Sequence, residues 1–270
     1  MKSWTNHPLR VTGRLLWLGG ELLLAALNYS IHRALCSKDS LPSARAAWLQ
    51  KSSRRVLRVF GVETKCAGKI PSSGLLVCNH LSYLDILVLA ALAPSVFVAK
   101  GEVKHWPVLG WFTKLAGTIF VQREKRLKTA QARDEINTAL RVGLLVVLFP
   151  EGTSSGGETV LPFKSSLLEP ATQQKHLLTT GFLRYELDDG DVAEEVCYWK
   201  DMTLVPHLLN LLGKRGIRAS VRFAQLRDGS ADRKELSRQL HAEVVKLKES
   251  LPVGLKYESH RYLRPQLRTN

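Results

Sequence analysis

The stretch Leu75-Leu-Val-Cys-Asn-His80-Leu-Ser-Tyr-Leu-Asp85 decides the fold, because an apolar run typical of a buried strand passes directly into a helical pattern. The transition predicts a strand over residues 75–78 and a helix over residues 82–92. His80 then stands at the carboxyl end of the strand, where open α/β sheets bind their ligands. The stretch therefore predicts an α/β fold and, at the same point, a candidate site.

The alternation of strands and helices continues along the chain. Short apolar runs rich in β-branched residues predict further strands, at 96–99, 118–122, 144–149 and 217–223. Helical patterns predict helices over 128–142 and 230–251. In the second of these, apolar residues recur every three or four positions, at Leu236, Leu240, Val244, Leu247 and Leu251, so one side faces a core. This order of elements predicts an α/β fold with a mixed, mostly parallel sheet flanked by helices.

Size and composition limit the class of protein. A chain of 270 residues is long enough for one large α/β domain, and a composition with 45% hydrophobic and 23% charged residues excludes a disordered chain and a transporter with many spans. The formal net charge of +15 predicts an anionic partner. The four cysteines lack the paired spacing of a zinc site or a redox disulfide, so we expect no metal site. They are expected to be free thiols, at Cys36, Cys66, Cys78 and Cys197.

The N-terminal segment predicts contact with a membrane surface. Its apolar run over residues 15–27 follows Arg10 and Arg14, is interrupted by Glu21 and is shorter than the roughly 20 residues that a spanning helix needs. A signal-peptide cleavage site does not follow clearly, so we expect an interfacial or half-inserted helix. This expectation places the protein on the cytoplasmic face of the cell membrane.

Residues 41–60 combine five basic side chains with an apolar side and Trp48, a pattern typical of a helix that lies on an anionic lipid surface. Packing of this helix on the chain's own domain is the alternative. Gly61 is a natural helix stop, so we expect membrane-associating helices over residues 1–60 and the α/β domain over residues 61–270.

The spacing of His80 and Asp85 indicates general-base chemistry. Ser82 is a good N-cap, and a carboxylate three residues later can point back over the helix start and reach one ring nitrogen of His80. Such a contact fixes the tautomer and leaves the other nitrogen free to accept a proton from a hydroxyl. General-base catalysis of this kind accelerates a reaction about 100- to 10,000-fold. The alternative is that Asp85 only caps the helix and His80 is a structural loop residue.

Two further stretches supply candidate binding groups. The strand over 144–149 runs into a turn with Pro150, Gly152 and small hydroxyl residues, so turn amides near Gly152 and the hydroxyls of Thr153 or Ser154 could approach a headgroup or an oxyanion. The predicted strand Gly117-Thr-Ile-Phe-Val-Gln-Arg123 ends in an arginine. Its planar guanidinium group can donate hydrogen bonds to two oxygens of a phosphate at once. A single arginine is also commonly just an exposed charge.

Taken in order, these blocks resemble the glycerolipid acyltransferase family typified by lysophosphatidic acid acyltransferase. The matching blocks are His80 with Asp85, Gly117 to Arg123, and Phe149-Pro-Glu-Gly-Thr-Ser154. The resemblance implies that His80 is the base and Asp85 its orienting partner. It also implies groups that bind the acceptor's phosphate, namely Arg123, Glu151 and Gly152, with Lys100 as a further contact. Thr180 stands where the family has a proline, which leaves the substrate choice open.

The resemblance further implies a reaction. A fatty acyl group would pass from an acyl carrier protein or coenzyme A thioester to the free hydroxyl of lysophosphatidic acid, giving phosphatidic acid, with no bound cofactor. Another lysolipid, such as lyso-ornithine lipid, is the alternative acceptor. The basic tail over residues 256–270 could contact nucleic acid, but no recognised nucleic-acid module precedes it, so we expect no nucleic-acid partner.

Two rival interpretations compete with acyl transfer. Gly152-Thr-Ser154-Ser-Gly156 satisfies the nucleophile-elbow pattern of serine hydrolases, although residues 157–162 are a poor start for the helix that an elbow requires. A membrane-binding protein without activity is the second rival. Binding alone needs neither His80 nor Asp85, so the presence of both argues against it.

Overall fold

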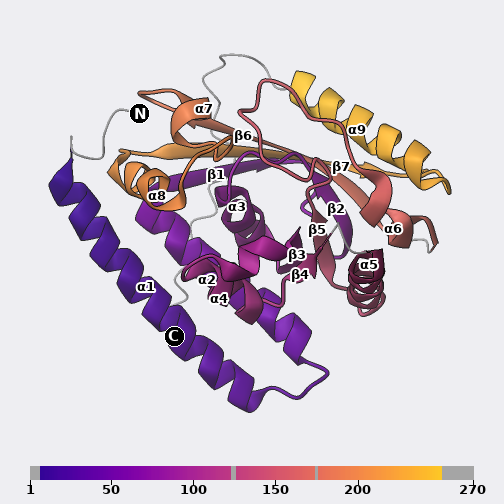
Figure 1. Cartoon of the computed structure of the whole chain (residues 1–270), viewed down its shortest axis with the longest axis horizontal. Coiled ribbons are helices and arrows are strands. Elements are labelled where there is room, and N and C mark those ends of the chain that lie inside the picture. The colour runs from indigo at the N-terminus through magenta and orange to yellow at the C-terminus, as the bar shows by residue number, and fades with distance from the viewer. Residues whose placement is uncertain (1–6, 123–125, 174–175, 251–270) are drawn as a thin grey trace.

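The computed structural model describes residues 7–122, 126–173 and 176–250 (Figure 1). Within them lies a seven-stranded sheet with the order β1-β7-β6-β2-β5-β3-β4, in which every neighbouring pair is parallel except β6 and β7. Its strands are β1 (Val62–Ala67), β2 (Gly74–Cys78), β3 (Ser95–Lys100), β4 (Ile119–Val121), β5 (Leu145–Leu148), β6 (Leu178–Leu187) and β7 (Ile217–Leu226). The predicted α/β fold with a mixed, mostly parallel sheet is confirmed.

Helices cover both faces of this sheet (Figure 1). They are α1 (Pro8–Leu35), α2 (Leu41–Phe60), α3 (Leu84–Leu92), α4 (Leu109–Leu115), α5 (Arg126–Arg141), α6 (Glu169–Gln173), α7 (Val192–Glu195), α8 (Leu204–Gly213) and α9 (Arg233–Glu249), with the 3₁₀ turns η2 (Gly101–His105) and η3 (Ser165–Leu167). Each predicted helix and strand is present, with ends that differ by a few residues. Leu251 and the basic tail lie outside the described residues.

Alternation along the central strands divides the core into two layers. In β2, Leu76 and Cys78 pack with α2, α3 and α8 on one face, whereas Leu75 and Val77 pack with α5 and α9 on the other. β5 alternates in the same way. All five residues of β2 are buried, as expected for a parallel strand that is covered on both sides. The carboxyl end of β2 therefore emerges at a fixed point between two layers of helices.

The second N-terminal helix is part of this core. Trp48 is only 3% exposed, and its indole N–H donates to the carbonyl of Ala25 at 2.8 Å. Two basic side chains of α2 contact other helices: Arg54 donates to the carbonyl of Ala91, and Arg55 pairs with Glu21 at 2.9 Å. The apolar side of this helix, Trp48 included, therefore packs on the chain's own domain, which is the stated alternative to a lipid surface.

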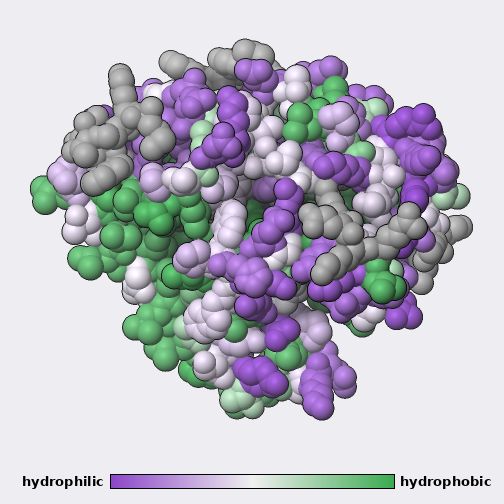
Figure 2. Space-filling model, viewed as in Figure 1, coloured by the Kyte–Doolittle hydropathy of each residue, from purple (hydrophilic) through white to green (hydrophobic). Residues whose placement is uncertain are grey.

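The first helix has a different surface. Its outward side carries a row of large apolar side chains that are 44–89% exposed, at Leu9, Leu15, Leu16, Trp17, Leu23, Leu24, Leu27, Ile31 and Leu35. We call these residues the α1 apolar face; Figure 2 shows a hydrophobic area where α1 lies in Figure 1. Arg14 ties the helix to the C-terminal end of α8 through the carbonyls of Leu212 and Lys214. Across the described ranges, no helix has both the length and the apolar composition needed to cross a bilayer.

Candidate active site

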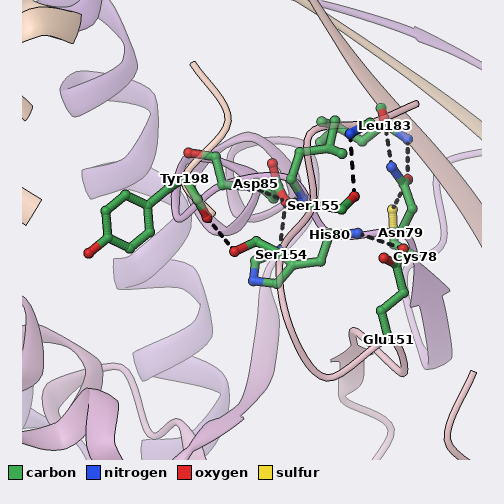
Figure 3. A network of polar contacts seen from close by, with 12 residues as sticks. Cys78, Asn79, His80, Asp85, Glu151, Ser154, Ser155, Leu183 and Tyr198 are labelled. Carbon is green, nitrogen blue, oxygen red and sulfur yellow. Dashed lines mark hydrogen bonds and ion pairs between the residues drawn. The ribbon is translucent and has the colours of Figure 1, made fainter. Parts of the chain in front are cut away.

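The loop that carries His80 is fixed by its neighbours on both sides. Asn79 is 3% exposed and bonds β6 twice: its amide donates to the carbonyl of Leu183 at 3.0 Å and accepts from the N–H of Leu183 at 2.7 Å. The carbonyl of His80 accepts from the N–H of Ser155 at 3.0 Å. The turns after β2 and β5 are therefore joined at the predicted edge of the sheet (Figure 3).

Asp85 is the central hydrogen-bond acceptor of the site. This carboxylate has no solvent exposure, and its Oδ2 accepts from His80 Nδ1 at 2.7 Å and from the N–H groups of Leu81 and Ser82 at 2.7 and 3.0 Å. An ionised carboxylate only accepts hydrogen bonds, so Nδ1 carries the proton and Nε2 has the free lone pair. The expected approach of Asp85 to one ring nitrogen is what the structure shows.

The predicted N-cap is wrong. Helix α3 begins at Leu84, and the hydroxyl of Ser82 has no partner among the described residues. The carboxylate of Asp85 instead accepts from the N–H groups of Leu81 and Ser82, which lie in the turn before the helix. One side chain therefore both holds the turn before the helix and orients the histidine.

Tyr185 completes the environment of Asp85 and was not found from the sequence. Its hydroxyl, on β6, donates to Asp85 Oδ1 at 2.8 Å, and the ring is 3% exposed. Burial and the charge of Asp85 raise the pKa of Tyr185 well above its usual range, so the phenol stays a donor. A sequence signal for this contact is lacking, because it depends on the position of a strand 100 residues away.

Glu151 lies beneath His80 rather than at the cavity. It is 2% exposed, and its Oε1 accepts from the backbone N–H of His80 at 3.1 Å. Burial raises the pKa of Glu151 to about 8, against the opposing effect of the N–H groups of His80 and Leu161. At neutral pH the carboxyl is therefore mostly uncharged. This position does not fit the phosphate contact that the resemblance implied, and it fits a support for the His80 loop.

The ring of His80 lies at the edge of a large apolar cavity. It stacks on Phe149 with centroids 4.1 Å apart, and its side chain is 20% exposed. Within the described residues, nothing hydrogen-bonds to Nε2. The cavity has a volume of about 850 Å³ and extends from His80 between α1, α2 and α4; its apolar lining includes Leu18, Leu22, Trp48, Val56 and Phe112. Its mostly apolar lining suits a lipid chain better than a small polar metabolite.

Four of the predicted binding residues line this cavity, namely Lys100, Gly152, Thr153 and Ser154. Lys100 is exposed. Gly152 has a φ of +71°, a conformation that glycine adopts without strain, and its N–H donates to the carbonyl of Phe149. That N–H is thus already engaged in the turn. Arg123 lies outside the described residues.

The serine-hydrolase pattern does not have the geometry that it needs. The hydroxyl of Ser154 donates to the carbonyl of Tyr198, and residues 155–164 contain no helix. Thr180, the departure from the family pattern, is buried in β6 and donates to the carbonyl of Ala224 at 3.1 Å. It does not line the cavity, so this departure alters a strand and not the site.

A later segment forms another wall of the cavity. Tyr198 is held against the His80 loop, because its N–H donates to the carbonyl of Leu81 at 2.8 Å. Behind it, His207 Nε2 lies 3.0 Å from the carbonyl of Cys197, and Nδ1 lies 3.0 Å from the hydroxyl of Tyr83. Burial lowers the pKa of His207 to about 4, so this histidine is neutral and structural.

A histidine oriented by a buried carboxylate, with its second nitrogen free at the mouth of a large apolar cavity, has the arrangement needed to accept a proton from a hydroxyl. The fold and the site together are those of a lipid acyltransferase.

Comparisons with known proteins agree with this class. A family model described as Acyltransferase matches residues 62–182. The lyso-ornithine lipid O-acyltransferase of Rhizobium meliloti (strain 1021) is 34% identical over 85% of this chain and 84% of that protein. The 1-acyl-sn-glycerol-3-phosphate acyltransferase of Neisseria meningitidis serogroup B is 34% identical over 60% of this chain and 69% of that protein. The chain therefore belongs to the acyltransferase family that contains these lysolipid enzymes.

A solved structure shows the same fold. The crystal structure of the 1-acyl-sn-glycerophosphate acyltransferase PlsC from Thermotoga maritima superposes with a TM-score of 0.62 at 17% identity, and the match covers 92% of this chain and 99% of that chain.

Proposed function

We propose that the protein transfers a fatty acyl group from a thioester to the hydroxyl of a lysolipid, with His80 as general base. The observation that carries this proposal is the 2.7 Å contact between His80 Nδ1 and Asp85, which leaves Nε2 unprotonated at the cavity. The acceptor hydroxyl gives its proton to Nε2 while its oxygen attacks the thioester carbonyl. The tetrahedral intermediate then collapses, the thiolate leaves, and it takes the proton from the imidazolium.

The chain's own groups support each part of this reaction. The apolar cavity holds an acyl chain, and the turn after β5 lies beside it with Thr153. Since the N–H of Gly152 is engaged, the N–H groups of Thr153 and Ser154 are the better candidates for the oxyanion. Lys100 and Arg123 are the cationic candidates for an anionic headgroup. The thioester is that of an acyl carrier protein or of coenzyme A.

The acceptor that we propose is lyso-ornithine lipid. The extent of similarity supports it, because the relatives named for this substrate match most of the chain, beyond the residues that the family model covers. Lysophosphatidic acid, which would give phosphatidic acid, is the second candidate. It is favoured by the block that ends in Arg123 and by Lys100 at the cavity, because two cations suit a phosphate.

An acceptor panel with purified protein and labelled acyl thioester tests both candidates. Each lysolipid is offered at equal surface concentration, and the product is separated by chain and headgroup. His80→Ala should lose at least about 100-fold in rate with the preferred acceptor. A near-normal rate for this variant would refute the proposal. Ser154→Ala should keep most of its activity, whereas a serine hydrolase would lose all covalent turnover.

We further propose that α1 seats the protein on the cytoplasmic face of the cell membrane. The α1 apolar face supports this, since each leucine moved from water into lipid contributes about 1.5–3 kcal/mol. The formal net charge of +15 supports an anionic surface. Leu16→Asp with Leu23→Asp should reduce cosedimentation with anionic vesicles at least tenfold and leave the thermal midpoint unchanged. Equal sedimentation of this variant and the native protein would contradict the proposal.

A further inference from the structure

Lys200 brings a positive charge to the cavity from a part of the chain that the family model does not cover. The model matches residues 62–182, whereas Lys200 lies in the later segment that forms a wall of the cavity. Within the described ranges, the basic and acidic side chains that line the cavity are those of His80, Lys100, Glu102 and Lys200. Lys200 is therefore a charge at the cavity from outside the residues that define the family.

The backbone before Lys200 is fixed against the two turns that flank His80. The N–H of Tyr198 donates to the carbonyl of Leu81 at 2.8 Å, and the carbonyl of Tyr198 accepts from the hydroxyl of Ser154 (Figure 3). Two residues of chain span at most about 7 Å, so the backbone of Lys200 lies within that distance of Tyr198. Lys200 is thus held near the reacting end of the cavity.

The side chain of Trp199 places the ammonium of Lys200. Its indole N–H donates to the carbonyl of Ala193 at 2.9 Å, and its six-membered ring packs on Gly156, where an added Cβ would lie 2.7 Å from Cζ2. The Nζ atom of Lys200 lies 3.8 Å from the centroid of the Trp199 ring. This cation–π contact positions the ammonium without neutralising it, and its N–H groups remain donors for an anion.

The charge of Lys200 is not balanced inside the protein. The side chain is exposed, and it has no ion-pair partner within the ranges that the structure describes. The backbone of Lys200 has a φ of +52° at the second position of a turn, which the N–H of Met202 closes on the carbonyl of Trp199. Such positions favour glycine or asparagine, because other side chains are strained there. A free charge at a strained position beside the cavity points to a role in binding.

We propose that Lys200 binds the anionic group of the acceptor headgroup, a carboxylate or a phosphate, and so contributes to the choice of lysolipid. This inference rests on the proposed function, because it takes the cavity as the place of the acceptor during acyl transfer. The headgroup lies at the exposed rim beside Lys200, while the acceptor hydroxyl reaches Nε2 of His80. Lys100 lines the same cavity and shares the anion.

Binding of acceptors in the absence of any thioester tests this site without turnover. Lyso-ornithine lipid is compared with its methyl ester, which lacks the carboxylate, and lysophosphatidic acid is compared with monoacylglycerol, which lacks the phosphate. Lys200→Asn removes the charge and keeps a residue that tolerates the left-handed conformation. This variant should bind the anionic member of at least one pair about fivefold more weakly, because a charge-assisted bond at a solvated rim is modest. Binding of the neutral member should not change.

Two variants control for charge and for surface effects. Lys200→Arg keeps the charge and should keep the preference for the anionic acceptor. Lys128→Asn removes an exposed lysine from α5, on the other face of the sheet, and should bind every acceptor as the native enzyme does. Unchanged binding of both anionic acceptors by Lys200→Asn would overturn the proposal, and so would equal weakening by Lys128→Asn.

The donor also carries anions, so a kinetic arm separates the two sources. A hexadecanoyl coenzyme A thioester has phosphates, whereas the N-acetylcysteamine thioester has none. If Lys200→Asn raises KM for the coenzyme A thioester alone and leaves acceptor binding unchanged, the anion belongs to the donor and the proposal is wrong.

The two proposals can also fail separately. A preference for an anionic acceptor that is lost in Lys200→Asn supports the lysine site even if no tested acceptor is acylated. Normal turnover that depends on His80, with acceptor binding that does not depend on Lys200, refutes the lysine site and leaves acyl transfer intact.

Discussion

Tyr185→Phe tests whether the environment of Asp85 controls the chemistry. The substitution removes one oxygen atom and keeps the ring in the core. The oxygen that it removes donates to Asp85 Oδ1 at 2.8 Å, where both side chains are buried. Because the pKa of Tyr185 is raised by burial and by the charge of Asp85, the phenol remains a donor at neutral pH. The variant therefore removes one of the four donors that hold the carboxylate.

The size of the effect follows from the charge on the acceptor. A hydrogen bond to a charged group contributes about 1.5–3 kcal/mol, so the free energy of unfolding should fall by roughly this amount. With Oδ1 unpaired, the carboxylate holds the ring of His80 less firmly. We expect kcat to fall about tenfold, well short of the loss for removing His80 itself. KM should not change, because Tyr185 does not line the cavity.

Release of the free thiol from an acyl thioester gives kcat and KM, measured well below the thermal midpoint of each variant. Tyr29→Phe is the matched control, because its hydroxyl accepts from Arg45 between α1 and α2, away from His80. That variant should lose stability and keep its kcat. If Tyr185→Phe lowers the thermal midpoint but leaves kcat unchanged, the hydrogen bond serves the fold alone and the reasoning is wrong.

The further predictions concern three residues that support the site. Glu151→Gln keeps an acceptor for the N–H of His80 and should retain most activity, while Glu151→Ala should lose it, as initial rates will show. Because the pKa of Glu151 is raised from 4.5 to about 8, its contribution to stability is complete below pH 4.5 and is lost as the pH rises through 8, so melts of Glu151→Gln should show a smaller decline over that interval. For His207, with its pKa lowered from 6.5 to about 4, stability falls as the pH drops from 6.5 to 4, and His207→Gln should flatten that decline. Asn79→Ala leaves two backbone groups of Leu183 unpaired and should cost about 2–4 kcal/mol in urea unfolding.

The sequence predicts this fold well where short-range patterns determine it. β2 and β5 are apolar on both faces and end at turn residues, so their burial and their ends are readable from composition. β1 was not predicted, and the strand around Thr180, β6, was implied only by the family resemblance. β1 is partly exposed and polar, Val62-Glu-Thr-Lys-Cys-Ala67, and it becomes a strand because it pairs with β7 at the sheet edge. Tertiary pairing, rather than the local pattern, decides such a segment.

The N-terminal helices show a second limit of the sequence. Both carry apolar and basic residues, so the pattern predicts a lipid surface for each. The two helices differ in their contacts, which depend on residues distant in sequence. Trp48 of α2 packs against α1, Arg54 donates to a carbonyl of α3, and Arg55 pairs with a glutamate of α1. An amphipathic pattern identifies the side of a helix that becomes buried, but the choice between protein and lipid depends on what else is close enough to cover it.

The candidate site was predictable where residues close in sequence donate hydrogen bonds to the carboxylate of Asp85. Asp85 is an ionised group without solvent, which is stable only if donors surround it. Three of its four donors lie within five residues, namely His80 Nδ1 and the N–H groups of Leu81 and Ser82. A strand end, a turn and a first helical turn are enough to bring them together, so the spacing of histidine and aspartate already contains most of the geometry. The fourth donor, Tyr185, and the support from Glu151 come from other strands. Their positions depend on the order of strands in the sheet, which the local sequence does not encode.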